Sequence, residues 1–294
     1  MTKPGLQVTW PNLARVIEWA CRVEVLAPKP GNVNAYSSGH GMKLEDFLHS
    51  AQAIAPVLST AGKGVGERIL AAVIATKTAV NTNTNLGIIL LFSPLARATL
   101  EAEKPATLRP ALTTVLARLG IDDARLAYQA IRLAQPGGIG HSSAHDIAEE
   151  PQVTLLEAMQ WAAEWDSIAR QYHNGFGDIF ELGIPSLLEG FSKWENIEWA
   201  TTLAYLTFLA TLPDSLVRRK YGATVAAQVA QKASELQKKL INQGPVSQMK
   251  SRLRAWDQAL KRDFINPGTS ADLTAATLLV GGLCQPSALK FLEA

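Results

Sequence analysis

Apolar residues recur at intervals of three and four along most of the chain, the spacing of an α-helix with one buried face. The pattern predicts helices over 13–26, 47–58, 69–80, 88–100, 154–172, 196–212, 215–242, 247–264 and 271–279. The strict alternation typical of a half-buried strand is nearly absent. We therefore predict an all-α fold.

The chain has 294 residues, of which 47% are hydrophobic and 18% charged, so a sizeable core is expected. No linker rich in Pro, Ser or Gly divides it, and no repeat of fixed period is visible. We predict a single compact multi-helix domain over residues 1–294, with functional loops between its helices.

Several features indicate a cytoplasmic protein. No apolar stretch approaches the roughly 20 residues that cross a bilayer, and the N-terminus lacks the pattern of a signal peptide. The two cysteines, Cys21 and Cys284, form no disulfide framework. We expect no membrane association.

Charge is unevenly distributed, although the net charge is only +2. Residues 214–262 hold 11 Lys/Arg against 3 Asp/Glu. Such a block can attract polyphosphate or nucleic acid, or it can be the solvated face of a long helix. The cluster Arg218-Arg219-Lys220 is the exception, because other polar residues of interest lie beside it.

The first polar loop contains Lys29-Pro30-Gly31. Two prolines stiffen the backbone around Lys29, and an ammonium held in place suits a phosphate group. An ordinary turn between helices is the alternative. His40 follows between two glycines and is a candidate acid or base, although a loop histidine is more often a surface residue.

The second polar loop, Asn81-Thr82-Asn83-Thr84-Asn85, exceeds what a helix cap requires. Its amides and hydroxyls suit ribose hydroxyls, a base edge or metal-bound water, and we select Asn81, Asn83 and Asn85. Glu67 lies about four turns upstream, and we place it near the same mouth. A solvated helix residue is the alternative for Glu67.

Two further segments carry candidate ligands for phosphate and metal. Asp214 and Arg218 have the i, i+4 spacing of a surface ion pair; alternatively, Asp214 binds Mg²⁺ while Arg218 or Arg219 grips phosphate. Near the end, Pro267-Gly268 precedes a helix start at which Ser270 can bind an anion. Asp272, in the first turn, can face a cation or can interact with the helix dipole alone.

The segment 135–153 is rich in glycine, histidine and carboxylates. It does not match a tetrahedral zinc pattern, since no cysteine accompanies it. We predict instead that it covers the site, because clustered glycines permit movement.

In this order, the motifs resemble those of the triphosphoribosyl-dephospho-coenzyme A synthase family over residues 20–280. Lys29-Pro30-Gly31, Asn81-Thr82-Asn83 and Asp214 with Arg218-Arg219 carry the resemblance, and Pro267 to Leu273 is its most specific string. The resemblance implies an all-helical enzyme that uses ATP with Mg²⁺ or a similar divalent cation. It implies transfer of the triphosphoribosyl group of ATP to a hydroxyl of dephospho-coenzyme A, with release of adenine.

Under this resemblance, Lys29, Arg218, Arg219 and Ser270 bind phosphate, and Asp214 with Asp272 binds Mg²⁺. Asn81, Asn83 and Asn85 orient the ribose or the acceptor, and Glu67 or His40 is the acid or base. The partners are then small molecules, and a homodimer is compatible with this assignment.

The chain departs from the family at two places. Thr84-Asn85-Leu86-Gly87 replaces the family's His-Lys-Gly run, and Gly41 stands where an acidic residue usually precedes the methionine. These differences leave open another acceptor, a ribosyl-bearing precursor of a tetrahydromethanopterin-type one-carbon cofactor. A non-catalytic helical protein that binds nucleic acid or partner proteins is a further alternative, but aromatic residues are not interleaved with the basic block.

Overall fold

The computed structural model describes residues 11–138 and 142–287. Its α-helices are α1 (Leu13–Leu26), α2 (Leu44–Leu58), α3 (Val65–Val80), α4 (Leu86–Glu101), α5 (Leu108–Ala117), α6 (Ile121–Ala134), α7 (Leu155–Ala162), α8 (Ser167–Asn174), α9 (Ile184–Trp194), α10 (Ile197–Thr211), α11 (Ser215–Tyr221), α12 (Ala223–Gln243), α13 (Ser247–Arg262) and α14 (Gly268–Cys284). Two single turns, η1 (Pro105–Thr107, 3₁₀) and η2 (Ile179–Gly183, π), accompany them. No strand occurs in the described residues, and the all-α prediction is confirmed.

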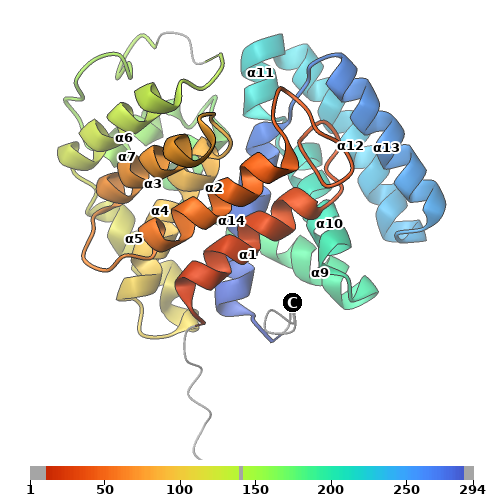
Figure 1. Cartoon of the computed structure of the whole chain (residues 1–294), viewed down its shortest axis with the longest axis horizontal. Coiled ribbons are helices and arrows are strands. Elements are labelled where there is room, and N and C mark those ends of the chain that lie inside the picture. The colour runs from red at the N-terminus through yellow and green to blue at the C-terminus, as the bar shows by residue number, and fades with distance from the viewer. Residues whose placement is uncertain (1–10, 139–141, 288–294) are drawn as a thin grey trace, which may run out of the picture.

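The helices surround α14. Figure 1 shows α2 to α7 on one side of the molecule and α9 to α13 on the other, with α1 and α14 between them. Helix α14 packs against α1, α4 and α10. The C-terminal segment of the chain therefore holds the two sides together.

The sequence of α14 explains its central place. Nearly all of its side chains are buried, and none but Asp272 is charged. A helix that is apolar all round is stable only when other elements cover every face. Its glycines allow close approach: a Cβ on Gly282 would lie 2.7 Å from Cγ1 of Val16 in α1.

Two clusters of buried side chains form the core. The larger is built mainly from α1 to α9 and α14, and the smaller from α10 to α13. Helices α10 and α14 contribute to both. Within the part of the chain that the structure describes, no helix is both long and apolar enough to cross a bilayer.

Several helix boundaries differ from the sequence prediction. Helices α5, α6 and α9 were not predicted. Helices α5 and α9 contain Pro110 and Pro185 in their first turns, where proline is compatible with a helix although it marks a break in the sequence pattern. Two predicted helices are each divided. The range 154–172 breaks where the carboxylate of Asp166 caps α8, and 215–242 breaks at Gly222, whose φ is +88°.

Candidate functional site

A cavity of about 730 Å³ is lined by residues from several separate segments of the sequence. Chief among these segments are the end of α1 with its following loop, the start of α4, the end of α6 with residues 135–137 and 142–147, the α7–α8 region, α11 and the start of α14. Of the residues predicted for the site, those that line the cavity are His40, Asn83, Asn85, Arg219 and Asp272. Those that do not line it are Lys29, Glu67, Asn81, Asp214, Arg218 and Ser270.

Lys29 is fully buried, and its ammonium group is occupied by protein acceptors. It forms an ion pair with Glu24 and donates to Oδ1 of Asn32 at 2.6 Å and to the carbonyl of Val33 at 3.1 Å. These contacts use the three donors of an ammonium group. Lys29 therefore does not face the cavity. It holds in place Glu24 and Asn32, which do line the cavity.

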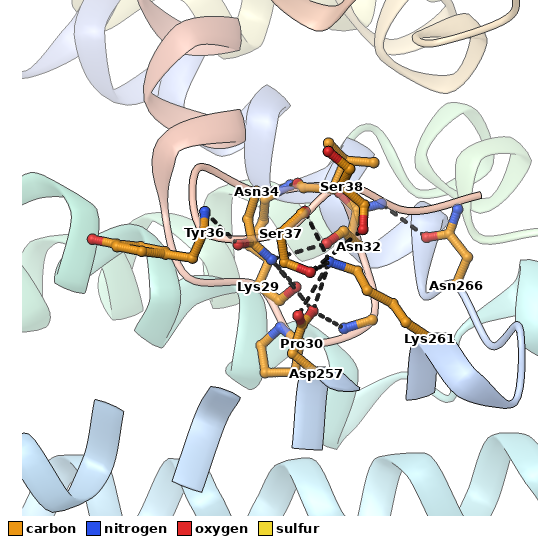
Figure 2. A network of polar contacts seen from close by, with 12 residues as sticks. Lys29, Pro30, Asn32, Asn34, Tyr36, Ser37, Ser38, Asp257, Lys261 and Asn266 are labelled. Carbon is orange, nitrogen blue, oxygen red and sulfur yellow. Dashed lines mark hydrogen bonds and ion pairs between the residues drawn. The ribbon is translucent and has the colours of Figure 1, made fainter. Parts of the chain in front are cut away.

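The loop after α1 is locked to the segment that precedes α14. The amide of Asn32 donates to Oδ1 of Asn266 at 2.9 Å (Figure 2). The backbone N–H of Gly31 donates to Asp257 of α13 at 2.9 Å. Gly31 has φ +85°, and a Cβ there would lie 2.7 Å from Cδ of Pro267. The motif that contains Gly31 and the motif that begins at Pro267, more than 230 residues apart, therefore meet at Gly31, where only glycine fits without strain.

Helix α13 supports the outer side of the same loop. The ammonium of Lys261 donates to the carbonyl of Ser37 at 2.9 Å and lies 3.0 Å from Asp257 (Figure 2). The hydroxyl of Tyr205 donates to the carbonyl of Pro30 at 2.7 Å. The loop that bears His40 is therefore fixed from several sides.

His40 lines the cavity with a defined tautomer. Its Nε2 lies 2.8 Å from the carbonyl oxygen of Gly31, which can only accept, so Nε2 carries the proton. Burial lowers the pKa of His40, and the charges of Lys261 and Lys220 lower it further. The imidazole is therefore neutral at pH 7, with Nδ1 as a bare acceptor. The backbone of His40 has φ +58°, which is uncommon for a residue other than glycine.

The Asn/Thr loop forms part of the cavity wall at the start of α4. Residues 82–87 line the cavity, whereas Asn81 ends α3 in the left-handed conformation (φ +51°) and faces a smaller hollow. Oδ1 of Asn83 accepts from the backbone N–H of Leu86 at 3.2 Å, and Oδ1 of Asn85 accepts from Thr76 at 3.1 Å. The carbonyl oxygens of both amides are used inside the protein, which leaves their NH₂ groups for a ligand.

The expected position of Glu67 is wrong. Glu67 is exposed in the first turn of α3, where its carboxylate accepts from the backbone N–H of Gly64 at 2.7 Å. Asn81 lies at the other end of that helix. At 1.5 Å per residue the two are about 20 Å apart, so Glu67 caps α3 far from the Asn/Thr loop.

Asp214 is a buried helix cap. Its Oδ1 accepts from the backbone N–H groups of Leu216 and Val217, each at 3.0 Å. Its Oδ2 accepts from the backbone N–H and the hydroxyl of Ser270, at 2.7 and 2.8 Å. The four contacts leave no room for the predicted metal ion or ion pair with Arg218, and Ser270 is occupied as well.

Cations reach the cavity from α11. Arg219 and Lys220 line it, whereas Arg218 does not. Nη1 of Arg219 lies 3.2 Å from Oδ2 of Asp166, the cap of α8, which also lines the cavity. Lys220 lies against the 135–138 segment, since a Cβ on Gly137 would be 3.1 Å from its ammonium nitrogen. Segment 135–153 was predicted to cover the site, and its residues 139–141 lie outside the described residues.

Two carboxylates, Glu24 and Asp272, face the cavity from the central helices α1 and α14. Burial raises the pKa of Asp272 well above its usual range, and the nearby charges of Glu24 and Asp214 raise it further. Burial also raises the pKa of Glu24, which Lys29 partly offsets. A Cβ on Gly87 would clash with the Asp272 carboxylate, so that carboxylate lies against the start of α4.

The sequence interpretation did not include Glu24, although a signal was present. Glu24 follows Ala20 and Ile17 at helical spacing, so it lies on the apolar face of α1 and is buried. An acidic residue on such a face needs a partner. That partner, Lys29, lies five residues later in the first polar loop.

The charges around the cavity suit a divalent cation bound together with a polyanion. Four carboxylates line it (Glu24, Asp146, Asp166 and Asp272) against the two cations of α11. Glu24 is paired with Lys29 and Asp166 with Arg219, so a divalent cation at Asp272 and Glu24 would add the positive charge that a bound polyphosphate needs. No group of three or more metal-binding side chains occurs in the described residues. Mg²⁺ fits such a site, because it commonly takes one or two carboxylates and completes its shell with phosphate oxygens and water.

The chain is similar to a known protein family and to a solved structure. The chain matches the CitG family model, ATP:dephospho-CoA triphosphoribosyl transferase, over residues 11–291. It is also similar to a solved structure from Archaeoglobus fulgidus whose proposed identity is triphosphoribosyl-dephospho-CoA synthase. That structure has 26% sequence identity and a TM-score of 0.64, and the similarity covers 81% of this chain and 99% of that chain. No curated protein matched the sequence.

Proposed function

The chain belongs to the ATP:dephospho-CoA triphosphoribosyl transferase family and is an enzyme of the transferase class; from this premise we propose that it moves the triphosphoribosyl group of ATP onto a hydroxyl of dephospho-coenzyme A and releases adenine. The match to the family over residues 11–291 carries the proposal. A cavity with cations, carboxylates and amides on its walls supports it, because cations pair with phosphates, carboxylates can hold Mg²⁺ and amides can bind ribose hydroxyls.

The reaction exchanges one bond at the ribose. The bond between C1′ and the adenine nitrogen breaks, and a bond between C1′ and the acceptor oxygen forms. The proton of the acceptor hydroxyl is lost, and the leaving adenine takes up a proton. Positive charge develops on the sugar in between, so an effective enzyme must bind the triphosphate, stabilise the sugar and accept a proton.

His40 is the group we assign to the acceptor proton. It lines the cavity, and it is neutral with a bare Nδ1, as a general base requires. Glu67, the other residue considered from the sequence, lies at the far end of α3. No described residue accepts from the NH₂ groups of Asn83 and Asn85, so these groups can donate to ribose or acceptor hydroxyls.

The triphosphate subsite, as proposed, lies between α11 and the start of α14. Arg219 and Lys220 supply the positive charge. Asp272 and Glu24 are the residues that would hold Mg²⁺, which when bound neutralises phosphate charge and anchors the donor. The pair Glu24 and Asp272 replaces the pair Asp214 and Asp272 that the sequence predicted. Asp214 is excluded because it is fully hydrogen-bonded as a helix cap.

The test is adenine release from ATP and Mg²⁺, followed by chromatography with and without dephospho-coenzyme A. We expect release that depends on dephospho-coenzyme A and yields a product carrying the triphosphoribosyl group. Release only with another ribosyl-bearing precursor would retain the donor chemistry and replace the acceptor. ATP binding without release under either condition would contradict the proposal.

A further inference from the structure

Two tryptophans in the cavity wall have no role in the site described so far. Trp161 lies at the end of α7 and Trp165 in the turn before α8, and both line the cavity. Their exposed fractions are 44% and 43%, whereas Trp19 and Trp199 are buried in the core. A large apolar ring left in contact with solvent is informative when it lines a cavity, because its burial by a ligand would be favourable.

The two rings form a right-angled corner. Their centroids are 6.3 Å apart with an interplanar angle of 86°. His145 meets Trp161 at 5.8 Å and 89° from the other direction. A flat ring stacked on one indole would therefore meet the other edge-on, and both arrangements are favourable for aromatic pairs.

Backbone hydrogen bonds hold the elements that carry these rings. The N–H groups of Trp165 and Asp166 both donate to the carbonyl of Ala162, at 3.2 and 2.9 Å, which closes a tight turn after α7. The hydroxyl of Tyr128 donates to the carbonyl of His145 at 2.8 Å. The turn and the histidine are thus fixed independently of any ring stacking.

Cations lie directly beside this corner. Asp166, the residue after Trp165, is 3.2 Å from Arg219, and Lys220 lines the same cavity. An apolar ligand would not require the two cations, and a simple polyphosphate would not require the two indoles. A planar base joined to phosphates uses both, since bases stack on aromatic side chains and phosphates pair with Arg and Lys.

We propose that Trp161 and Trp165 form the stacking platform for the adenine ring of an adenine nucleotide whose phosphates extend toward Arg219 and Lys220. The inference rests on the proposed function, which it deepens by locating the base. Both substrates carry adenine: it is the leaving group of ATP, and it is retained in dephospho-coenzyme A. The shared chemistry is an adenine nucleotide, and the two sources are separated by experiment.

The experiment measures binding by calorimetry, with no turnover required, so its result is independent of the adenine-release assay. Wild-type protein and the variants Trp161→Ala and Trp165→Ala are titrated separately with Mg²⁺-ATP, with dephospho-coenzyme A and with Mg²⁺-tripolyphosphate. Trp256→Ala, on α13 outside this cavity, is the matched control. We expect each cavity variant to weaken one nucleotide about 10- to 100-fold and to leave tripolyphosphate unchanged.

The separate titrations show whether the stacked adenine belongs to ATP or to dephospho-coenzyme A. Weakening confined to ATP assigns the platform to the leaving adenine, and weakening confined to dephospho-coenzyme A assigns it to the acceptor. Unchanged affinity for both nucleotides would overturn the proposal. An equal loss for tripolyphosphate would also overturn it, since the tryptophans would then act only on the shape of the cavity. A nucleotide-selective loss in a protein that releases no adenine would retain the platform and remove the proposed reaction.

Discussion

One oxygen of Asp214 accepts two hydrogen bonds from Ser270, from the backbone N–H at 2.7 Å and from the hydroxyl at 2.8 Å. The other oxygen caps α11. A single carboxylate therefore joins the beginnings of α11 and α14, the helices that carry Arg219 and Asp272 into the cavity. The positions of the two charged groups depend on this joint.

Asp214→Asn should destabilise the protein. In either orientation the new amide directs an NH₂ group at a backbone N–H that needs an acceptor, which leaves a buried donor unsatisfied. We expect the free energy of unfolding in urea to fall by about 2–3 kcal/mol, with activity falling as well. Unchanged stability with activity lost would instead return Asp214 to the role of a metal ligand.

Asp272→Asn should show the opposite pattern, with activity lost and stability gained. Burial beside Glu24 raises the pKa of Asp272 in the folded protein, so ionising this carboxyl costs stability. The amide removes that cost. We expect adenine release to fall at least ~100-fold while the melting temperature of the free protein rises.

The size of this stability difference depends on pH. Below the usual carboxyl pKa, Asp272 is protonated in both the folded and the unfolded chain, so wild type and Asp272→Asn should melt alike. As the pH rises toward the raised pKa of the folded state, the wild type loses stability relative to the variant. Melting curves from pH 4 to 8 measure the difference, and Mg²⁺-ATP should reduce it. A difference that shrinks with rising pH would contradict the assignment.

Lys29→Met should destabilise the fold by leaving Glu24 buried without its partner. Removing one member of a buried pair costs about 3–5 kcal/mol. The double variant Glu24→Gln, Lys29→Met should recover part of this loss, since no uncompensated charge remains. Urea unfolding of the single and double variants gives the coupling between the two residues. If Lys29→Met kept full stability and lost only ATP affinity, the original phosphate role would stand.

Gly31→Ala should destabilise more than Gly41→Ala. Both glycines have positive φ, +85° and +77°, so both substitutions carry the backbone cost of about 1 kcal/mol. A Cβ on Gly31 also meets Pro267 and Leu260, whereas one on Gly41 has nothing within 4 Å. We expect a clearly lower melting temperature and loss of adenine release for Gly31→Ala only. Equal effects at the two positions would show that the contact with Pro267 is unimportant.

His40→Gln should reduce kcat/KM about 100-fold or more and flatten its dependence on pH. In the wild type, the low pKa of His40 predicts that kcat/KM rises with pH through a value below 6.5 and is then level. The glutamine NH₂ can still donate to Gly31, so the loop should be retained and the melting temperature little changed. A wild-type pH profile in the variant would remove His40 from proton transfer.

Much of the architecture was visible in the sequence because helical periodicity is a local property. The spacing of apolar residues predicted α1 to α4 and α10, and the all-α class followed from it. Helices α5, α6 and α9 were missed, although Ala124, Ala127, Tyr128 and Ile131 lie on one buried face of α6. The breaks before α8 and α12 were missed because one capping carboxylate, or one glycine with positive φ, decides each of them.

The sequence by itself determined the helical class, the polar loops and the family motifs, since each is a property of neighbouring residues. Only the tertiary structure decided which member of each motif reaches the cavity. Asp272 faces it and Asp214 does not; Lys29 supports Glu24 rather than a phosphate. The physical reason is that a buried charged group must satisfy its hydrogen bonds somewhere, and residues distant in the sequence decide whether a protein partner is already there.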